Sequence, residues 1–147
     1  MLRILLCVAL CTAAWADGAG GLRWTAPPNF KNDGSTRPMR AATYTVPAAA
    51  GDVEGGECVA YYFGQGQGGS VEANLQRWTG QFQDASGQPM KNAATKKKSV
   101  HGLPVTTIDV SGTYTGAGGP MMTSKSSKPG YRMLGAIVEG PQGSVLF

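Results

Sequence analysis

A glycine-rich segment in the middle of the chain is the first candidate for chemistry. Gly64, Gly66 and Gly69 have the spacing G-x-G-x-x-G between a predicted strand and a predicted helix. In dinucleotide-binding folds such a loop presents backbone N–H groups and a helix N-terminus to a phosphate. Here a polar loop beginning at Asp84 follows the helix, where a strand ending in an acidic residue is expected, and no Lys-Ser/Thr pair of a P-loop is present. We therefore interpret the glycines as a strand-to-helix turn that needs positive φ, with nucleotide or anion binding as the alternative.

Three polar residues flank the apolar stripe of the predicted helix. At 100° per residue Asn74 and Gln81 fall on the same side of the stripe, with Arg77 further round. They are candidates to face a ligand beside the sheet, and the alternative is that they bond to neighbouring loops. With the glycines and Arg40, they complete the predicted ligand-binding set: Arg40, Gly64, Gly66, Gly69, Asn74, Arg77 and Gln81.

Arg40 shares the alternation of the apolar residues that follow it in a predicted strand. Its guanidinium therefore points toward an apolar side and needs a partner. A structural ion pair is one interpretation and an anion site is the other. The candidate partners are Asp52, Glu54, Glu57 and Asp109.

The other reactive residues do not suggest catalysis or metal binding. His101 is the single histidine, and no cysteines or carboxylates lie near it at ligand spacing. A Ser-His-Asp set has no G-x-S-x-G frame to support it. Cys58 lies inside an apolar strand and is predicted to be a buried, inert thiol, and the pair Met121-Met122 is too small for a copper site. We expect no catalytic residue, no metal and no cofactor.

The formal net charge of +4 is modest, and much of it lies in the run Lys96-Lys97-Lys98. No aromatic platform accompanies these lysines, so the run does not predict a nucleic-acid interface. We interpret it as an exposed strand edge that lysine protects against pairing with another sheet.

The first 16 residues predict a cleaved signal peptide. Arg3 is a positive start, residues 4–13 are apolar, and Ala14-Trp15-Ala16 matches the small-x-small rule, which leaves Asp17 as the new N-terminus. The apolar run is shorter than the about 20 residues that span a bilayer. We therefore expect a secreted or periplasmic chain without a transmembrane segment, whose single remaining cysteine forms no internal disulfide.

The hydrophobic pattern predicts a single α+β domain over residues 17–147. Its antiparallel sheet has about five or six strands, crossed by one main amphipathic helix near residues 70–83. The helix is indicated by Val71, Leu75, Trp78 and Phe82 on one stripe after the N-cap Ser70. The expected strands are 42–46, a central two-sided strand 57–63, 95–101, 105–115, 131–139 and 144–147, while 17–21 is a flexible leader and 116–130 a mobile loop.

Several of these motifs together resemble a family of uncharacterised exported bacterial proteins. The most specific is the run from Phe63 through the glycines to Asn74, followed by Arg77-Trp78-x-Gly80-Gln81-Phe82. The layout is more loosely similar to the PsbP-type fold, an antiparallel sheet flanked by helices. The resemblance transfers no catalytic residue. It implies export, and it implies a closing helix after Phe147, so we expect a C-terminally truncated chain, with a terminal edge strand as the alternative.

Together these features predict an exported, non-enzymatic binding or accessory protein of the periplasm or cell envelope. Its partner would be an unknown envelope protein or a small ligand, and not a nucleic acid. The alternative is an enzyme or a nucleotide- or anion-binding protein that uses the Gly64–Gly69 loop.

Overall fold

The computed structural model describes residues 16–116 and 127–147. The apolar run of the predicted signal peptide and most of the predicted loop 116–130 lie outside the described residues. The described part forms ten strands and one helix: β1 (Asp17–Ala19), β2 (Leu22–Trp24), β3 (Lys31–Asn32), β4 (Arg40–Val46), β5 (Gly56–Tyr62), α1 (Val71–Thr79), β6 (Phe82–Gln83), β7 (Ala94–Val100), β8 (Leu103–Tyr114), β9 (Lys128–Gly140) and β10 (Gly143–Leu146).

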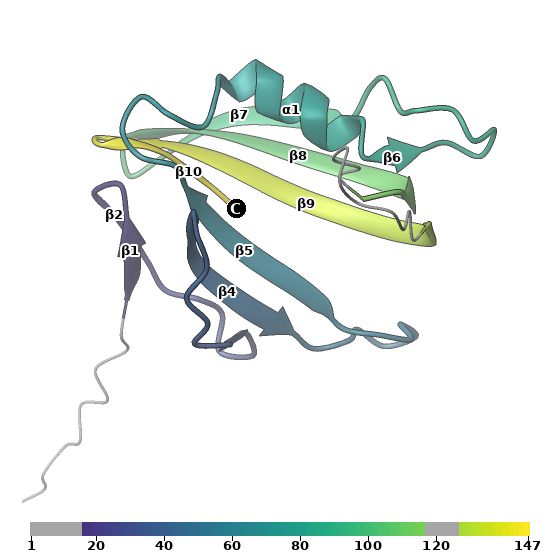
Figure 1. The fold of residues 1–147 in the computed structure, drawn as a ribbon, viewed down its shortest axis with the longest axis horizontal. Helices are drawn as coiled ribbons and strands as arrows, with labels where there is room; N and C mark the ends of the chain where they lie inside the picture. The colour runs from purple at the N-terminus through teal and green to yellow at the C-terminus, as the bar shows by residue number, and fades with distance from the viewer. Residues whose placement is uncertain (1–15, 117–126) are drawn as a thin grey trace, which may run out of the picture.

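Eight of these strands form one antiparallel sheet, and β1 and β2 form a separate hairpin (Figure 1). The sheet runs in the order β3-β4-β5-β10-β9-β8-β6, and β7 also pairs with β8. The predicted α+β class with a main helix is therefore wrong, because within the described residues the chain is mostly β with one helix of nine residues.

The predicted helix was too long because its pattern continued into a strand. Ser70 is the N-cap as expected, its hydroxyl accepting a hydrogen bond from the Ala73 N–H. The helix ends at Thr79, and its C-cap is Gly80. Phe82, the last member of the predicted stripe, lies in β6, where it pairs with Tyr114 and is 1% exposed. Burial of Phe82 therefore follows from strand pairing and not from the helical period.

The sheet buries side chains on both faces, because different elements cover them (Figure 1). Helix α1 covers one face, where Leu75 packs with Ile108, Ile137 and Leu146. The β1–β2 hairpin covers part of the other face, where Leu22 packs with Ala42, Tyr44, Ala60 and Val145. Neighbouring residues of a strand point to opposite faces. We call these the helix face and the hairpin face.

The hairpin corrects the prediction of a flexible leader at 17–21. Asp17–Ala19 pair with Leu22–Trp24, and Gly20 and Gly21 form the turn with φ values of 60° and 77°. The hairpin lies on the β9–β10 turn, where the Gln142 N–H donates to the Gly20 carbonyl.

A partly buried chain of hydrogen bonds also anchors the hairpin. The Trp24 indole N–H donates to the Tyr44 hydroxyl at 2.7 Å, and that hydroxyl donates to the Asp17 carboxylate. Burial, followed by the bond to Asp17, raises the pKa of Tyr44 to about 12. The first residues after the predicted cleavage point are thus part of the fold.

The lysine-rich strand is present where the sequence places it. β7 pairs with β8 from Ala94 to Val100, all seven of its residues are exposed, and no strand of the described chain pairs with its outer edge. This arrangement agrees with the interpretation of Lys96-Lys97-Lys98 as a protected strand edge.

Candidate functional site

The glycine-rich loop is held by the polar residues that the sequence offered as ligand-binding groups. Gly64, Gly66 and Gly69 all have positive φ, as the turn interpretation requires. Asn74 is 3% exposed, and its amide N–H groups donate to the carbonyls of Gly68 at 2.8 Å and Ser70 at 2.9 Å. Asn74 therefore fastens the loop to the first turn of α1.

Arg77 and Gln81 take different places. The Arg77 guanidinium donates to the Asn74 side-chain oxygen at 2.6 Å, so it fixes the orientation of the amide that holds the loop. Gln81 lies beyond the end of α1, and its carbonyl accepts hydrogen bonds from the N–H and the hydroxyl of Thr115. Of the three side chains, that of Asn74 bonds to the neighbouring loop, that of Arg77 bonds to Asn74, and the bonds at Gln81 are made by its backbone carbonyl.

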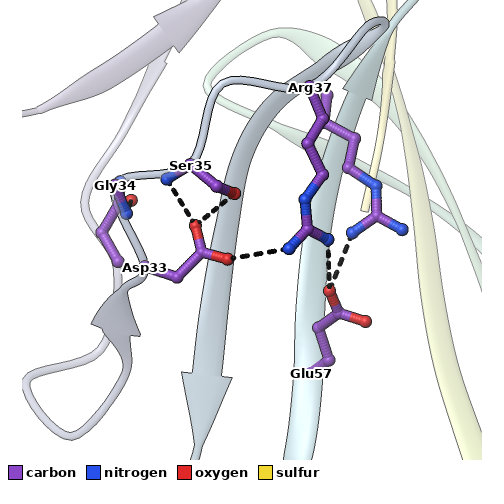
Figure 2. Close-up of polar contacts among 7 residues, drawn as sticks. Asp33, Gly34, Ser35, Arg37 and Glu57 are labelled. Carbon is purple, nitrogen blue, oxygen red and sulfur yellow. Dashed lines mark hydrogen bonds and ion pairs between the residues drawn. The ribbon is translucent and has the colours of Figure 1, made fainter.

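Arg40 makes the ion pair that the sequence analysis proposed, with one of its four candidate partners. Its guanidinium donates to a Glu57 carboxylate oxygen at 2.7 Å, and the guanidinium of Arg37 lies 3.8 Å from the same oxygen. Figure 2 shows Arg37 placed between Glu57 and Asp33, and the Arg37–Asp33 distance is 3.6 Å. The Glu57 carboxylate on β5 thus lies within ion-pair distance of two arginines near the start of β4.

Asp33 is itself fixed by a local turn. The N–H and the hydroxyl of Ser35 both donate to its carboxylate, at 2.8 and 2.7 Å (Figure 2). These bonds from Ser35, with a smaller contribution from Arg37, lower the pKa of Asp33. Arg37 therefore lies between the carboxylates of Asp33 and Glu57, while 48% of its side chain stays exposed.

A strained turn joins the two arginines. The Arg40 N–H donates to the Arg37 carbonyl at 3.2 Å, which closes the turn over Pro38 and Met39. Met39 has a φ of 63°, a left-handed conformation that favours glycine, and its side chain is exposed, at 61%. Its carbonyl accepts the Tyr62 N–H, so the strained residue is fastened to β5.

Aromatic side chains connect this turn to the glycine loop. The Arg40 guanidinium lies over the Tyr61 ring at 5.5 Å from its centroid. The Tyr61 and Phe63 rings are stacked at 6.0 Å with an interplanar angle of 8°. A Cβ atom on Gly68 would lie 2.9 Å from the Phe63 ring, so the loop packs directly on that ring. We call Arg37, Met39, Arg40, Tyr61 and Phe63 the arginine–aromatic strip.

The strip brings Arg40 and the glycine loop into one surface, which the sequence analysis did not anticipate. The predicted site residues did not include Arg37, Met39, Tyr61 and Phe63. Two signals were present: aromatic residues at i and i+2 at the end of a strand, and two arginines separated by a Pro-x turn. Neither signal shows that strands β4 and β5 pair so that Arg40 lies opposite Tyr61.

A shallow depression also lies over the loop between β6 and β7. It is lined by Asp84, Gln88, Pro89, Met90, Lys91 and Asn92. The Asp84 carboxylate accepts hydrogen bonds from the N–H and hydroxyl of Ser86 and from the Gln88 N–H, and these bonds lower its pKa. The acid therefore stabilises its own loop.

The described residues hold no group of three or more His, Cys, Asp or Glu side chains placed to bind a metal ion. Cys58 is a free, half-buried cysteine, and burial raises the pKa of its thiol, which keeps it protonated at neutral pH. Over residues 16–116 and 127–147, the structure has no helix with the length and hydropathy needed to cross a membrane.

Searches against protein-family models, curated proteins and solved structures found no match for this chain. The resemblance to exported bacterial proteins therefore stays a prediction from the motifs.

Proposed function

We propose that the chain is an exported binding or accessory protein of the cell envelope, and that it contacts a partner protein through the arginine–aromatic strip. The observation that carries the proposal is Met39, a large apolar side chain held exposed at a left-handed backbone position between two arginines.

The local chemistry of the strip supports a protein partner. A non-glycine residue in the left-handed region lowers the free energy of unfolding by about 1–2 kcal/mol relative to glycine. The exposed Met39 side chain therefore reduces the stability of the fold. Arginine, methionine and aromatic residues are enriched in the centres of protein interfaces. The partner we propose has an apolar pocket for Met39 and a carboxylate that reaches the half-exposed Arg37.

The nucleotide- or anion-binding alternative has less support from the loop geometry. The amide N–H groups of Asn74 are engaged by loop carbonyls, and the Ala73 N–H at the start of α1 is engaged by Ser70. Two of the polar groups beside the loop thus already have partners within the chain.

Export is supported by the position of the predicted cleavage point. Strand β1 begins at Asp17, and the Asp17 carboxylate accepts the Tyr44 hydroxyl bond. Mass spectrometry of the chain from its native envelope should find Asp17 as the first residue. Recovery of the intact Met1 end from the cytosol would overturn the export part of the proposal.

Substitution of Met39 separates binding from stability. A photoreactive group at position 39 of the mature chain should give one specific adduct in an envelope fraction, and excess unmodified chain should abolish it.

With that partner purified, Met39→Gly should weaken binding by at least about tenfold, the loss of one buried interface side chain. The same variant should raise the melting temperature, because glycine relieves the left-handed strain.

The matched control is Val53, which is fully exposed in the β4–β5 loop outside the strip. Val53→Ala should leave binding unchanged. Equal binding by the Met39→Gly chain and the unmodified chain, with the stability gain present, would show that the strip is not the contact surface.

A further inference from the structure

The positive charge of the chain is concentrated in one segment. Residues 85–108 contain four lysines, Lys91 and the run Lys96-Lys97-Lys98, and no aspartate or glutamate. In the rest of residues 17–147, eight Lys and Arg residues accompany nine Asp and Glu residues, so the two signs nearly cancel. The excess positive charge therefore belongs to this segment, which includes β7 and the first part of β8.

The lysines of β7 form no ion pair with a described residue. All nine Asp and Glu residues of the sequence lie in the described part, and none of the five ion pairs there includes Lys96, Lys97 or Lys98. Asp109 lies opposite Ala94 at the start of β7, but Arg132 donates to both of its carboxylate oxygens, at 2.8 and 2.6 Å. The charge of the three lysines is therefore available to a partner.

Strand β7 presents these lysines on both faces of a sheet edge. Its pairing with β8 is continuous along all seven residues, each of which is exposed. Thr95 lies opposite Ile108, whose side chain packs with α1, so Thr95 and Lys97 lie on the helix face, whereas Lys96 and Lys98 lie on the hairpin face. An edge exposed along its whole length suits an extended surface, which lysines on both faces can reach.

An exposed apolar side chain accompanies the lysines at the end of this edge. Val100, the last residue of β7, is 40% exposed and shares the hairpin face with Lys98. The chain then turns through His101 and Gly102, whose φ values of 49° and 80° are both positive, as in the two-residue turns that join hairpins. Val100 is thus held at the tip of the β7–β8 hairpin, beside the lysines.

An anionic membrane surface fits this combination better than an acidic protein segment does. Lysines on an edge strand hinder the addition of another strand, whereas binding to lipid headgroups needs no main-chain pairing. Basic side chains beside exposed apolar ones are the pattern by which peripheral proteins bind anionic lipids. The β7 edge has both kinds of side chain.

We infer that the edge formed by β7 and its turn docks on the surface of an anionic lipid membrane. Lys96, Lys97 and Lys98 lie against the lipid phosphates, and Val100 lies at the level of the headgroups. This inference stands on the distribution of charge and does not depend on the arginine–aromatic strip. Strands β10, β9 and β8 separate β7 from β5, so the two surfaces are formed by different parts of the sheet (Figure 1).

The test is flotation of the mature chain, beginning at Asp17, with vesicles of phosphatidylglycerol and phosphatidylcholine in equal amounts. At low ionic strength the chain should float with these vesicles and not with pure phosphatidylcholine, and about 1 M salt should release it by screening. Each lysine near an anionic leaflet strengthens binding about fivefold, so Lys97→Gln together with Lys98→Gln should weaken it about 25-fold. Absence of binding to the anionic vesicles would overturn the inference.

A matched pair of substitutions separates the β7 edge from the total charge. Arg23→Gln together with Lys31→Gln also removes two exposed positive charges, from β2 and β3. This control should bind the vesicles nearly as the unmodified chain does. Equal losses in the two double variants would show that net charge alone drives binding and would overturn the assignment to the edge.

A fluorophore at the turn gives a second readout. The emission of Val100→Trp should shift to shorter wavelength on anionic vesicles, because indole rings settle at the membrane interface. The same substitution at Val53, which is fully exposed in the β4–β5 loop, should give no shift. A shift at Val53 alone would place another surface on the membrane and overturn the inference. Binding to soluble polyglutamate without binding to vesicles would assign the lysines to an acidic protein partner and overturn the membrane assignment.

Discussion

The two ends of strand β9 show the same alternating strand in two environments. Near its C-terminal end, β9 lies between β8 and β10, α1 covers one face, and Ile137 is 1% exposed. Three residues earlier, Leu134 is 68% exposed, because at that point the strand has lost both β10 and the hairpin. Burial along β9 is thus decided by which elements lie beside each residue, and it does not follow from hydrophobicity alone.

Polar contacts on the hairpin face also differ in burial between the part that the hairpin covers and the part that it leaves open. Beneath the hairpin, Tyr44 on β4 is buried and takes part in a hydrogen-bond chain with Trp24 and Asp17. Away from the hairpin, Arg132 on β9 and Asp109 on β8 form an exposed ion pair. The Arg132 Nε and Nη2 atoms donate to the two carboxylate oxygens of Asp109 at 2.8 and 2.6 Å. This pairing lowers the pKa of Asp109 and raises that of Arg132. Buried networks of the first kind hold a unique fold, whereas exposed pairs contribute little to stability.

The largest expected effect is at Ile137. Ile137→Ala should lower the free energy of unfolding by about 3 kcal/mol, because it leaves a cavity between the sheet and α1. Leu134→Ala should change it by less than about 0.5 kcal/mol. Urea titration of both variants tests the contrast, and similar losses at the two positions would show that Leu134 is buried in solution.

Gly135 gives the next effect. A Cβ atom there would lie 2.7 Å from the Trp78 ring and 2.8 Å from Ile108, so Gly135→Ala should cost about 2 kcal/mol through displacement of the indole. The tryptophan fluorescence should also shift. The control is Gly112 on β8, which a Cβ would bring 2.5 Å from the Gln83 carbonyl, away from Trp78. Gly112→Ala should destabilise the chain without the spectral change, and an unchanged Gly135→Ala spectrum would contradict the packing.

The stability that Tyr44 contributes beneath the hairpin should depend on alkaline pH. The folded pKa of Tyr44 is raised from 10 to about 12, so folding favours the neutral phenol. The stabilisation is complete below pH 10 and is lost as pH rises through 12. Thermal unfolding at pH 8 to 12 measures it. Tyr44→Phe should remove this part of the pH dependence, and an unchanged alkaline profile would exclude Tyr44 as its source.

The sequence predicted the longer elements better than the fold class. The structure contains the predicted strand that carries Ala42, Tyr44 and Val46, and the predicted helix that begins after Ser70. Both were predictable because alternation and capping act over a few neighbouring residues. The strands β1, β2, β3 and β6 have two or three residues each, too few for any periodicity. Phe82 was misassigned because one apolar residue in a stripe does not distinguish a helical turn from the start of a strand.

The candidate surface was predicted in pieces. An ion pair was one of the two interpretations of Arg40, and Glu57 was one of its four candidate partners, because an arginine on the apolar side of a strand needs an acidic partner. Asn74 and Arg77 lie on α1 as predicted, but the Asn74 amide donates to the loop and the Arg77 guanidinium donates to Asn74. The stacking of Arg40 on Tyr61 depends on a register between β4 and β5, which includes an irregularity after Arg40.

Local sequence by itself determined where the longer strands and the helix lie, that the Gly64–Gly69 segment is a turn, and that Lys96-Lys97-Lys98 lie on an exposed edge. Those features depend on backbone conformation and on side chains a few residues apart. Only the tertiary structure decided that Met39 joins an aromatic strip, and that residues close together on β9 differ in burial. Each of these depends on pairing between segments far apart in the chain, which no local pattern specifies.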